Sequence, residues 1–176
     1  YSKNDYSVSL WIMPSGGPGT IITDLPSKAY EGYAYNLILD ANNFVHAKIW
    51  DLAQEYDLTY SEPLTIGLWY HVVFEVKNKC GYLYVNGQER SQKKLGDDFS
   101  SKNNGSLLIG SGLNGKIDDL RIYSKALSIN EILYLGENTQ DRYIIPDTLT
   151  SNQIVPNSQY FAFAEIEKII EDTEPN

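Results

Sequence analysis

The sequence predicts an all-β protein in which two antiparallel sheets pack face to face as a sandwich, with one short helix and a C-terminal tail. Residues 34–50 and 69–86 each fit a β-hairpin whose alternating side chains separate into an apolar and a mostly polar face. Two such hairpins indicate sheets that each bury one side in a shared core. Residues 115–135 alternate as a strand and then change to the period of a helix.

Composition fits one folded domain, expected over residues 1–136, followed by a linker and tail over residues 137–176. The chain has 176 residues, 42% hydrophobic content, a net charge of −9 and one cysteine. This size allows a self-sufficient core, and the acidic balance argues against nucleic acid as a partner. No apolar run is long enough for a membrane span, and no signal peptide is present. The start at Tyr1 leads us to expect a processed protein or a piece of a larger one.

The first strand is expected over residues 5–13, and the first hairpin is expected to turn at residues 41–43. A three-residue loop pairs Asp40 with Phe44 and so sets the register. The apolar face then holds Tyr35, Leu37, Leu39, Val45, Ala47 and Ile49. The opposite face holds Asn36, Ile38, His46, Lys48 and Trp50. Residues 51–63 read as a polar, tyrosine-rich connection.

The second hairpin is expected to turn at residues 78–81 and to pair Lys77 with Tyr82. Its apolar face holds Phe74, Val76, Leu83 and Val85, and its other face holds Glu75, Lys77, Tyr82 and Tyr84. We expect the apolar set, together with Leu37, Leu39 and Leu120, to be almost fully buried. We expect His46, Lys48 and Tyr84 not to be. A further strand follows at residues 106–110.

The closing strand, residues 117–123, is expected to point Leu120 and Ile122 one way. Its other face would hold Ile117, Asp119, Arg121 and Tyr123. The helix that follows has Ser128 as its N-cap, Glu131 as the partner in a capping box, and Gly136 as its stop. In the tail, residues 160–170 fit a helix slightly better than a strand.

The stretch GKIDDLRIYSKALS, Gly115 to Ser128, closely resembles the closing strand and helix of laminin G-like domains. These belong to the concanavalin A-like lectin and glucanase group. The strand around Trp11 and the turn at Asn86-Gly87 are also similar, so the resemblance spans about residues 5–135. It implies a jelly-roll sandwich and a non-catalytic recognition module of a larger secreted or cell-surface protein. The expected partner is a glycan or a cell-surface glycoprotein.

Two other functions stay open. One is a receptor-binding or structural domain of a bacterial toxin, similar to the lectin-like subdomain of clostridial neurotoxins. The other is a glycoside hydrolase with a displaced active site. Glucanases with this sandwich carry Glu-x-Asp-x-x-Glu or Glu-x-Asp-x-Glu on one strand, a spacing that suits a retaining mechanism. Here Glu55 and Asp57 are followed by Thr59 and Tyr60 where the second Glu should stand. We therefore expect no catalytic residue.

Sugars bind to aromatic rings flanked by amide and charged side chains, and the polar hairpin faces supply both kinds. The candidate ligand residues are Asn36, His46, Lys48 and Trp50, joined by Glu75, Tyr82 and Tyr84 if the two hairpins share a sheet. The alternative is an ordinary solvated sheet face with cross-strand pairs.

The resemblance also implies a structural calcium held by Asp118 and main-chain carbonyls. In the alternative, Asp118 and Asp119 pair with Lys116 and Arg121 at the surface. Laminin G-like domains normally have one more strand, which pairs beside the closing strand. Only residues 1–4 precede the first strand here, and an unpaired strand edge is rarely left uncovered. We predict that a strand from a neighbouring or parent polypeptide fills this edge, in preference to the chain's own tail.

Overall fold

The computed structural model describes residues 5–25, 35–50, 54–97, 99 and 106–137. The chain divides into two units, residues 1–136 and 137–176, and all the described strands belong to the first. The described part forms ten strands and one helix. The elements are β1 (Tyr6–Pro14), β2 (Gly19–Leu25), β3 (Tyr35–Leu39), β4 (Val45–Trp50), β5 (Glu55–Thr59), β6 (Tyr70–Lys77), β7 (Cys80–Val85), β8 (Gln88–Lys94), β9 (Ser106–Ile109), β10 (Gly115–Tyr123) and α1 (Ile129–Glu137).

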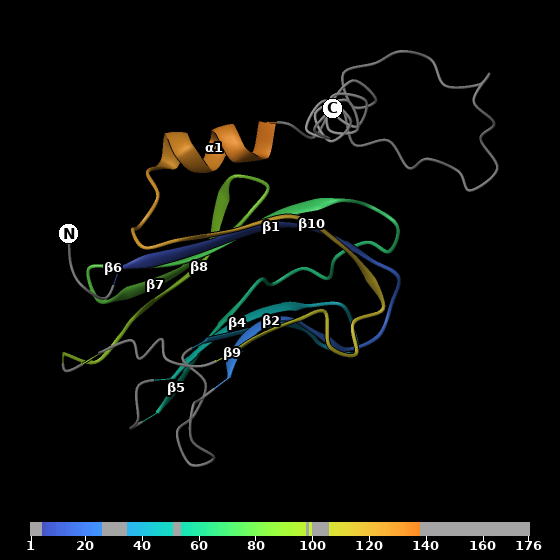
Figure 1. Ribbon diagram of the computed structural model, residues 1–176, viewed down its shortest axis with the longest axis horizontal. Helices are drawn as coiled ribbons and strands as arrows, with labels where there is room; N and C mark the ends of the chain where they lie inside the picture. Colours follow the sequence, from blue (N-terminus) through green and yellow to red (C-terminus); the bar gives the residue numbers. More distant parts are fainter. Residues whose placement is uncertain (1–4, 26–34, 51–53, 98, 100–105, 138–176) are drawn as a thin grey trace, which may run out of the picture. The chain divides into compact units, whose positions relative to one another are not determined.

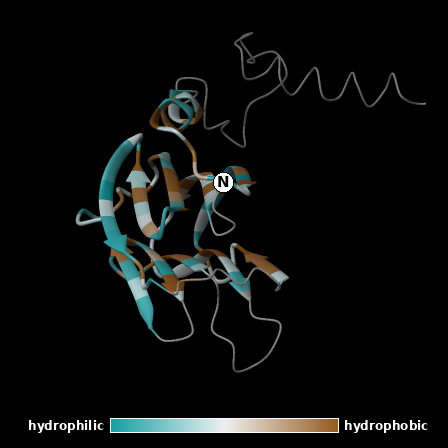
Figure 2. Ribbon diagram, turned by 90° about the vertical axis from the view of Figure 1, so that its left-hand side faces the viewer, coloured by the Kyte–Doolittle hydropathy of each residue, from teal (hydrophilic) through white to brown (hydrophobic). Residues whose placement is uncertain are grey.

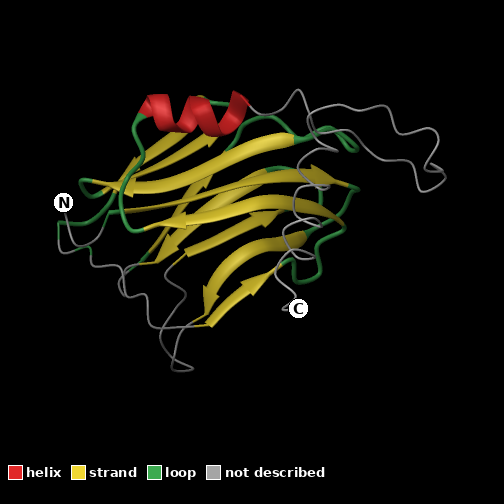
Figure 3. Cartoon of the chain, turned by 45° about the horizontal axis from the view of Figure 1, so that its top comes forward, coloured by secondary structure: helices red, strands yellow, loops and turns green. Residues whose placement is uncertain are grey.

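The strands form two five-stranded antiparallel sheets, which confirms the predicted sandwich (Figure 1). We call the sheet with the order β10-β1-β6-β7-β8 the first sheet. The sheet with the order β5-β4-β3-β2-β9 is the second sheet. The helix α1 lies on the first sheet only (Figure 3). No helix in the described ranges has the length and apolar content needed to cross a membrane.

The inner faces of the two sheets bury the apolar side chains that the alternation assigns to them. Leu37, Val45, Ala47 and Ile49 of the second sheet and Val76 and Leu83 of the first are 0% exposed. Leu39, Phe74 and Val85 are 1% exposed. All belong to one core cluster, so the predicted inner faces are confirmed except at Leu120. By contrast, β8 is exposed over most of its length, and Figure 2 draws it almost entirely in the hydrophilic colour.

The first hairpin has the predicted register. Leu39 lies opposite Val45, and the N–H of Asp40 donates to the carbonyl of Phe44 at 3.0 Å. The loop also needs a left-handed residue, which Asn43 supplies with φ 66°. The Asp40 carboxylate accepts the N–H groups of Asn42 and Phe44, both at 2.8 Å, and so closes the loop.

The predicted register of the second hairpin is wrong by two residues. Lys77 lies opposite Cys80, not Tyr82, and the turn consists of Asn78 and Lys79 alone. Both turn residues have positive φ, 51° and 59°, which two-residue hairpin loops require. Lysine is not a usual residue for that conformation, so the sequence favoured a longer loop. Because side chains alternate with period 2, a two-residue slip leaves the two faces unchanged.

The alternation predicted for β10 is interrupted by a bulge. Ser9 lies opposite Arg121, but Trp11 lies opposite Asp118, and Asp119 between them has φ 50°. The bulge turns Ile117 to the core side, the same side as Leu120, and both pack on the core. Leu120 is only half-buried because β10 is the edge of the sheet, which corrects the expectation of full burial. In the described part of the chain, no strand pairs with the outer edge of β10.

The helix α1 begins with the predicted capping box. The N–H of Ser128 donates to the Glu131 carboxylate at 2.7 Å, and the N–H of Glu131 donates to the Ser128 hydroxyl at 3.3 Å. The helix extends to Glu137, so Gly136 does not stop it as predicted. A Cβ on Gly136 would lie 3.1 Å from Nδ1 of His71, so this glycine allows the last turn to sit close on β6.

Candidate functional site

Four of the predicted ligand residues lie together on the outer face of the second sheet. Asn36 lies opposite Lys48, and His46 and Trp50 belong to the same strand as Lys48. All four are half-buried, as alternate residues on a solvent-facing sheet should be. The neighbouring strand β5 adds three polar side chains to this surface. The β3–β5 face, as we call it, consists of Asn36, Ile38, His46, Lys48, Trp50, Glu55, Asp57 and Thr59.

His46 lies between two carboxylates on this face. Its Nδ1 is 3.1 Å from Oδ1 of Asp57 and 3.1 Å from the Thr59 hydroxyl, and its Nε2 is 3.7 Å from Oδ2 of Asp40. Burial opposes ionisation of Asp40, but the N–H groups of Phe44 and Asn42 and the nearby His46 outweigh it and lower the pKa of Asp40. The ring of His46 is therefore fixed in orientation by its neighbours.

Lys48 is held by the other carboxylate of β5. Its Nζ is 2.9 Å from Oε1 of Glu55 and 4.0 Å from Oδ2 of Asp57. The hydrogen bond to Glu55 is the main reason why the pKa of Lys48 is raised, although partial burial opposes the shift. Trp50 lies directly opposite Glu55, so its side chain belongs to the same sheet face as this pair. The face thus offers an aromatic surface, an amide, an imidazole, a lysine ammonium and two carboxylates within three adjacent strands.

The contribution of β5 was missed at the sequence level. Residues 51–63 were expected to form a connection, yet Glu55–Thr59 pairs along β4. The signal was present, because Tyr56, Leu58 and Tyr60 alternate with polar residues and are buried.

The remaining predicted residues, Glu75, Tyr82 and Tyr84, lie on the outer face of the first sheet. The two hairpins belong to different sheets, so the seven residues do not form one ligand face. The helix α1 covers the group, and a second apolar cluster forms between them, with Val73, Tyr84, Leu127, Ile132 and Leu135 buried. This explains why Tyr84 is only 8% exposed, contrary to expectation.

Glu75 is fully buried under this cover. Its carboxylate accepts the N–H of Leu127 at 2.9 Å and the hydroxyls of Ser7 at 3.2 Å and Tyr84 at 3.4 Å. Burial raises the pKa of Glu75, and the hydrogen bonds only partly offset the shift. Glu75 therefore attaches the segment before α1 to the sheet, and in this arrangement a ligand cannot reach it.

Asp118 does not lie in a cluster of metal-binding side chains. Its Oδ1 accepts the N–H of Asp119 at 2.7 Å, and Asp119 pairs with Nε of Arg121 at 2.8 Å. Among the described residues, no group of three or more His, Cys, Asp or Glu side chains is placed to hold a metal ion. The side chains therefore do not fit a calcium site on their own, and calcium at Asp118, which would depend on main-chain carbonyls, stays a prediction.

Two facing antiparallel five-stranded sheets define this chain as a β-sandwich domain of the jelly-roll kind. A family model described as the concanavalin A-like lectin/glucanases superfamily matches residues 1–133. The chain therefore belongs to this superfamily, which confirms the resemblance drawn from Gly115–Ser128. No curated protein sequence matches the chain.

Three solved structures illustrate the likeness. Domain 4 of AbnA, an extracellular arabinanase from Geobacillus stearothermophilus, in complex with arabinotriose, is 26% identical with a TM-score of 0.60, covering 77% of this chain and 68% of that one. A point mutant of HCR/D is 24% identical with a TM-score of 0.64, covering 84% and 40%. The binding domain of botulinum neurotoxin DC in complex with SialylT is 18% identical with a TM-score of 0.64, covering 79% and 36%. The last two show the fold alone, and this chain spans two fifths or less of their length.

Proposed function

We propose that this chain is a non-catalytic carbohydrate-binding module of a larger secreted or surface protein, and that its β3–β5 face binds the sugar. The observation that carries the proposal is the grouping of Trp50 with His46, Lys48, Asn36 and two carboxylates on one half-buried outer sheet face. A sugar ring presents C–H groups to an aromatic surface and hydroxyls to polar groups at its edge. This face supplies both, with donors and acceptors already oriented by their neighbours.

Pre-ordering of the polar groups favours binding. His46 is fixed by Asp57 and Thr59, and Lys48 is fixed by Glu55. Side chains that are already ordered lose less conformational entropy when a ligand arrives. The likeness to the AbnA domain in complex with arabinotriose supports the same ligand class, because that domain is of similar extent and is the most alike in sequence of the three.

A catalytic reading of the same face is disfavoured by its ion pairs. A retaining glycosidase needs one carboxyl that holds a proton and a second that is free to attack the sugar. Glu55 pairs with Lys48, and Asp57 pairs with His46, so both carboxylates are already engaged by neighbouring side chains. Neither is free to attack a sugar, which favours binding without cleavage.

Glycan-array screening, followed by titration with arabinotriose and with the sialyl-T glycan, tests this function. We expect Trp50→Ala to weaken binding of the best glycan by about tenfold or more, since truncation of a central aromatic contact commonly costs over 1 kcal/mol. Trp50→Tyr keeps a ring at the same place and should retain most of the affinity. An array without a hit, or equal affinity for all three proteins, would refute the proposal, and release of reducing sugar would refute its non-catalytic part.

A second candidate is a structural or receptor-binding domain within a toxin-like protein. The sequence resemblance to the lectin-like subdomain of clostridial neurotoxins favours it, and the fold matches to HCR/D and to the botulinum neurotoxin binding domain, each over more than three quarters of this chain, are compatible with it. In that case the sandwich would support neighbouring domains and would bind no glycan itself. The array experiment separates the two, because a supporting domain would give no glycan hit.

A further inference from the structure

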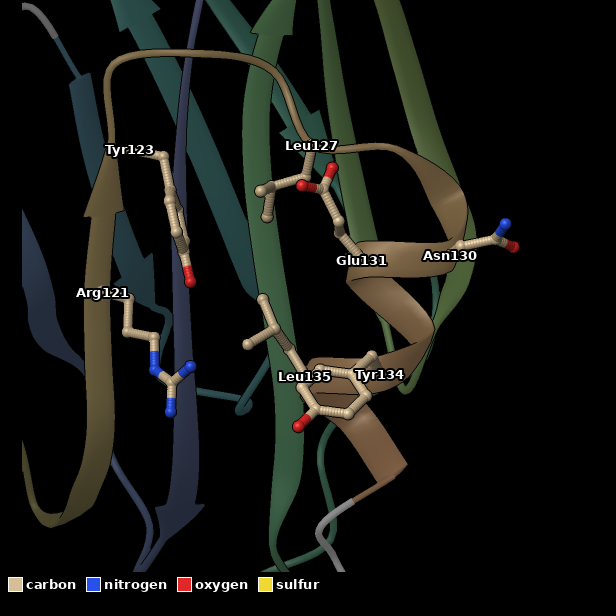
Figure 4. A pocket seen from close by; sticks show the side chains of 7 residues that line it. All are labelled: Arg121, Tyr123, Leu127, Asn130, Glu131, Tyr134 and Leu135. Carbon is tan, nitrogen blue, oxygen red and sulfur yellow. The ribbon is translucent and has the colours of Figure 1, made fainter.

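A separate cavity of about 360 Å³ lies on the other side of the sandwich, between β10 and α1. Figure 4 shows its two walls, with Arg121 and Tyr123 on the strand and Tyr134 and Leu135 on the helix. Leu127 and Leu135 form its apolar floor and are buried. Its size is at the lower end of the ~300–1,000 Å³ range of small-molecule sites, which suits a ligand of one ring or two.

Tyr134 is the most exposed large side chain of this region, at 66%. Its hydroxyl points from the helix toward the strand that carries Arg121 and Tyr123 (Figure 4). An aromatic ring that contributes so little to packing is available to a ligand. Asn130, whose amide points away from the strand in this view, contributes only to the rim.

The charges of the cavity are balanced within the protein. Arg121 is paired with Asp119, which is the main reason why its pKa is raised. Glu131 is bound by Lys125 and by the N–H and hydroxyl of Ser128, and these contacts lower its pKa to about 2. The cavity therefore has hydrogen-bonding groups of both kinds but no uncompensated charge. An ionic ligand would gain little here, whereas a neutral ligand rich in hydroxyls would find donors, acceptors and rings.

We propose that the β10–α1 cavity is a second saccharide site, which binds one neutral sugar residue between Tyr134 and the Arg121–Tyr123 wall. This inference rests on the proposed carbohydrate-binding function but uses none of the residues of the β3–β5 face. Tyr134 stacks against the C–H face of the sugar, and the Arg121 guanidinium and the Tyr123 hydroxyl bind its ring hydroxyls. The two sites lie on opposite outer faces of the sandwich, so one module would bind two sugar chains or two parts of one.

Titration of the full chain with separate probes, followed through its amide chemical shifts, tests the second site. The neutral probes are arabinotriose and the methyl glycosides of glucose, galactose, mannose and N-acetylglucosamine, and the acidic probe is the sialyl-T glycan. We expect at least one neutral probe to shift the amides of Arg121, Tyr123 and residues 130–135. Tyr134→Ala should weaken this response about tenfold, and Tyr134→Phe should retain it.

The variants separate failure of this inference from failure of the proposed function. Trp50→Ala should leave the response at the cavity unchanged, and Tyr134→Ala should leave the response of the β3–β5 face unchanged. Shifts confined to the β3–β5 face would overturn the second site and leave the proposed function intact. Shifts at neither site would overturn both, and a preference of the cavity for the acidic probe would overturn its assignment to a neutral sugar.

Discussion

Val8 and Ile122 lie directly opposite one another in the β1–β10 pair, yet Val8 is 0% exposed and Ile122 is 46% exposed. The second sheet repeats this relationship, since Ile22 is 0% exposed and its partner Ile109 on β9 is 50% exposed. Directly opposed residues of an antiparallel pair point to the same face. Among the described residues, the inner-face side chains of β9 and β10 are therefore half-exposed to solvent.

Truncation of one inner-face isoleucine on β2 and one on β9 measures how tightly the inner face is packed at these two strands. We expect Ile22→Ala to cost about 2–5 kcal/mol of unfolding free energy, as a cavity in a closed core does. Ile109→Ala should cost about 1 kcal/mol or less, because half of its side chain is already in water. Urea denaturation of both variants provides the comparison. Equal losses would mean that the β9 side is closed in solution.

The half-exposed inner-face side chains of β10 are also relevant to the prediction that a strand from another polypeptide pairs with β10. A nine-residue edge with half-exposed apolar side chains on its inner face is a site for strand addition. We expect the β10 amides that do not bond to β1 to exchange quickly in the isolated chain. They should become protected when the chain is part of its parent protein or assembly. Fast exchange in that larger context, with the chain monomeric, would contradict the prediction.

Glu75 should make stability depend on pH in a direction opposite to that of an ordinary surface carboxylate. Burial raises its pKa in the folded state, so the folded protein holds this proton more tightly than the unfolded chain. Its contribution therefore favours folding at low pH and is lost as the pH rises above its unfolded value, toward and through the raised folded value. We expect Glu75→Gln to gain stability relative to the parent as the pH rises above the unfolded pKa of glutamate, about 4.3.

Unfolding free energies of the two proteins at several pH values check this prediction, and their difference isolates Glu75 from the other titrating groups. Asp40, whose pKa is lowered, makes the opposite contribution in both proteins. A difference that does not change with pH would show that the Glu75 carboxylate titrates as it does in the unfolded chain.

Truncation of Phe74 measures how much packing in the central core contributes to stability. Phe74 is 1% exposed, and its ring lies 5.7 Å from that of Tyr6 and 5.9 Å from that of Tyr35, each distance measured between ring centroids. Phe74→Ala should cost roughly 3–5 kcal/mol, measured by denaturant unfolding, because it removes a fully buried ring. Glu89→Ala on the exposed strand β8 is a suitable control and should change the free energy by about 0.5 kcal/mol or less.

Much of the fold could be predicted because side-chain alternation tolerates errors of two residues. The wrong pairing of Lys77 still placed Phe74 and Leu83 on the inner face. The bulge at Asp119 was missed, although Ile117 and Leu120, which both pack on the core, are three residues apart and so out of step with a strict alternation. Its left-handed residue is an aspartate rather than a glycine, so no turn signal marks it.

The candidate site could be predicted only in part, because local pattern does not show which sheet a hairpin joins. His46 and Glu75 each occupy the polar face of a well-defined hairpin, yet one meets solvent and the other lies under α1. That difference depends on contacts between residues far apart in sequence, such as Glu75 with Leu127. The pairing of β5 beside β4 brought Glu55 and Asp57 to the site in the same non-local way.

Gly81 lies where the two sheets approach closely, on the side opposite β9 and β10. A Cβ at this position would be 2.6 Å from Cδ1 of Ile49 and 3.3 Å from Leu58, so only glycine fits without displacement of both. On the same side, Nζ of Lys93 on β8 donates to the carbonyl of Asp57 on β5 at 3.0 Å. Among the described residues, the two sheets thus contact one another along the β5–β8 margin, whereas inner-face side chains are half-exposed along the β9–β10 margin. Thermal fluctuation should separate the sheets first at the β9–β10 margin, which makes that margin the first part to admit water, a protease or a pairing strand.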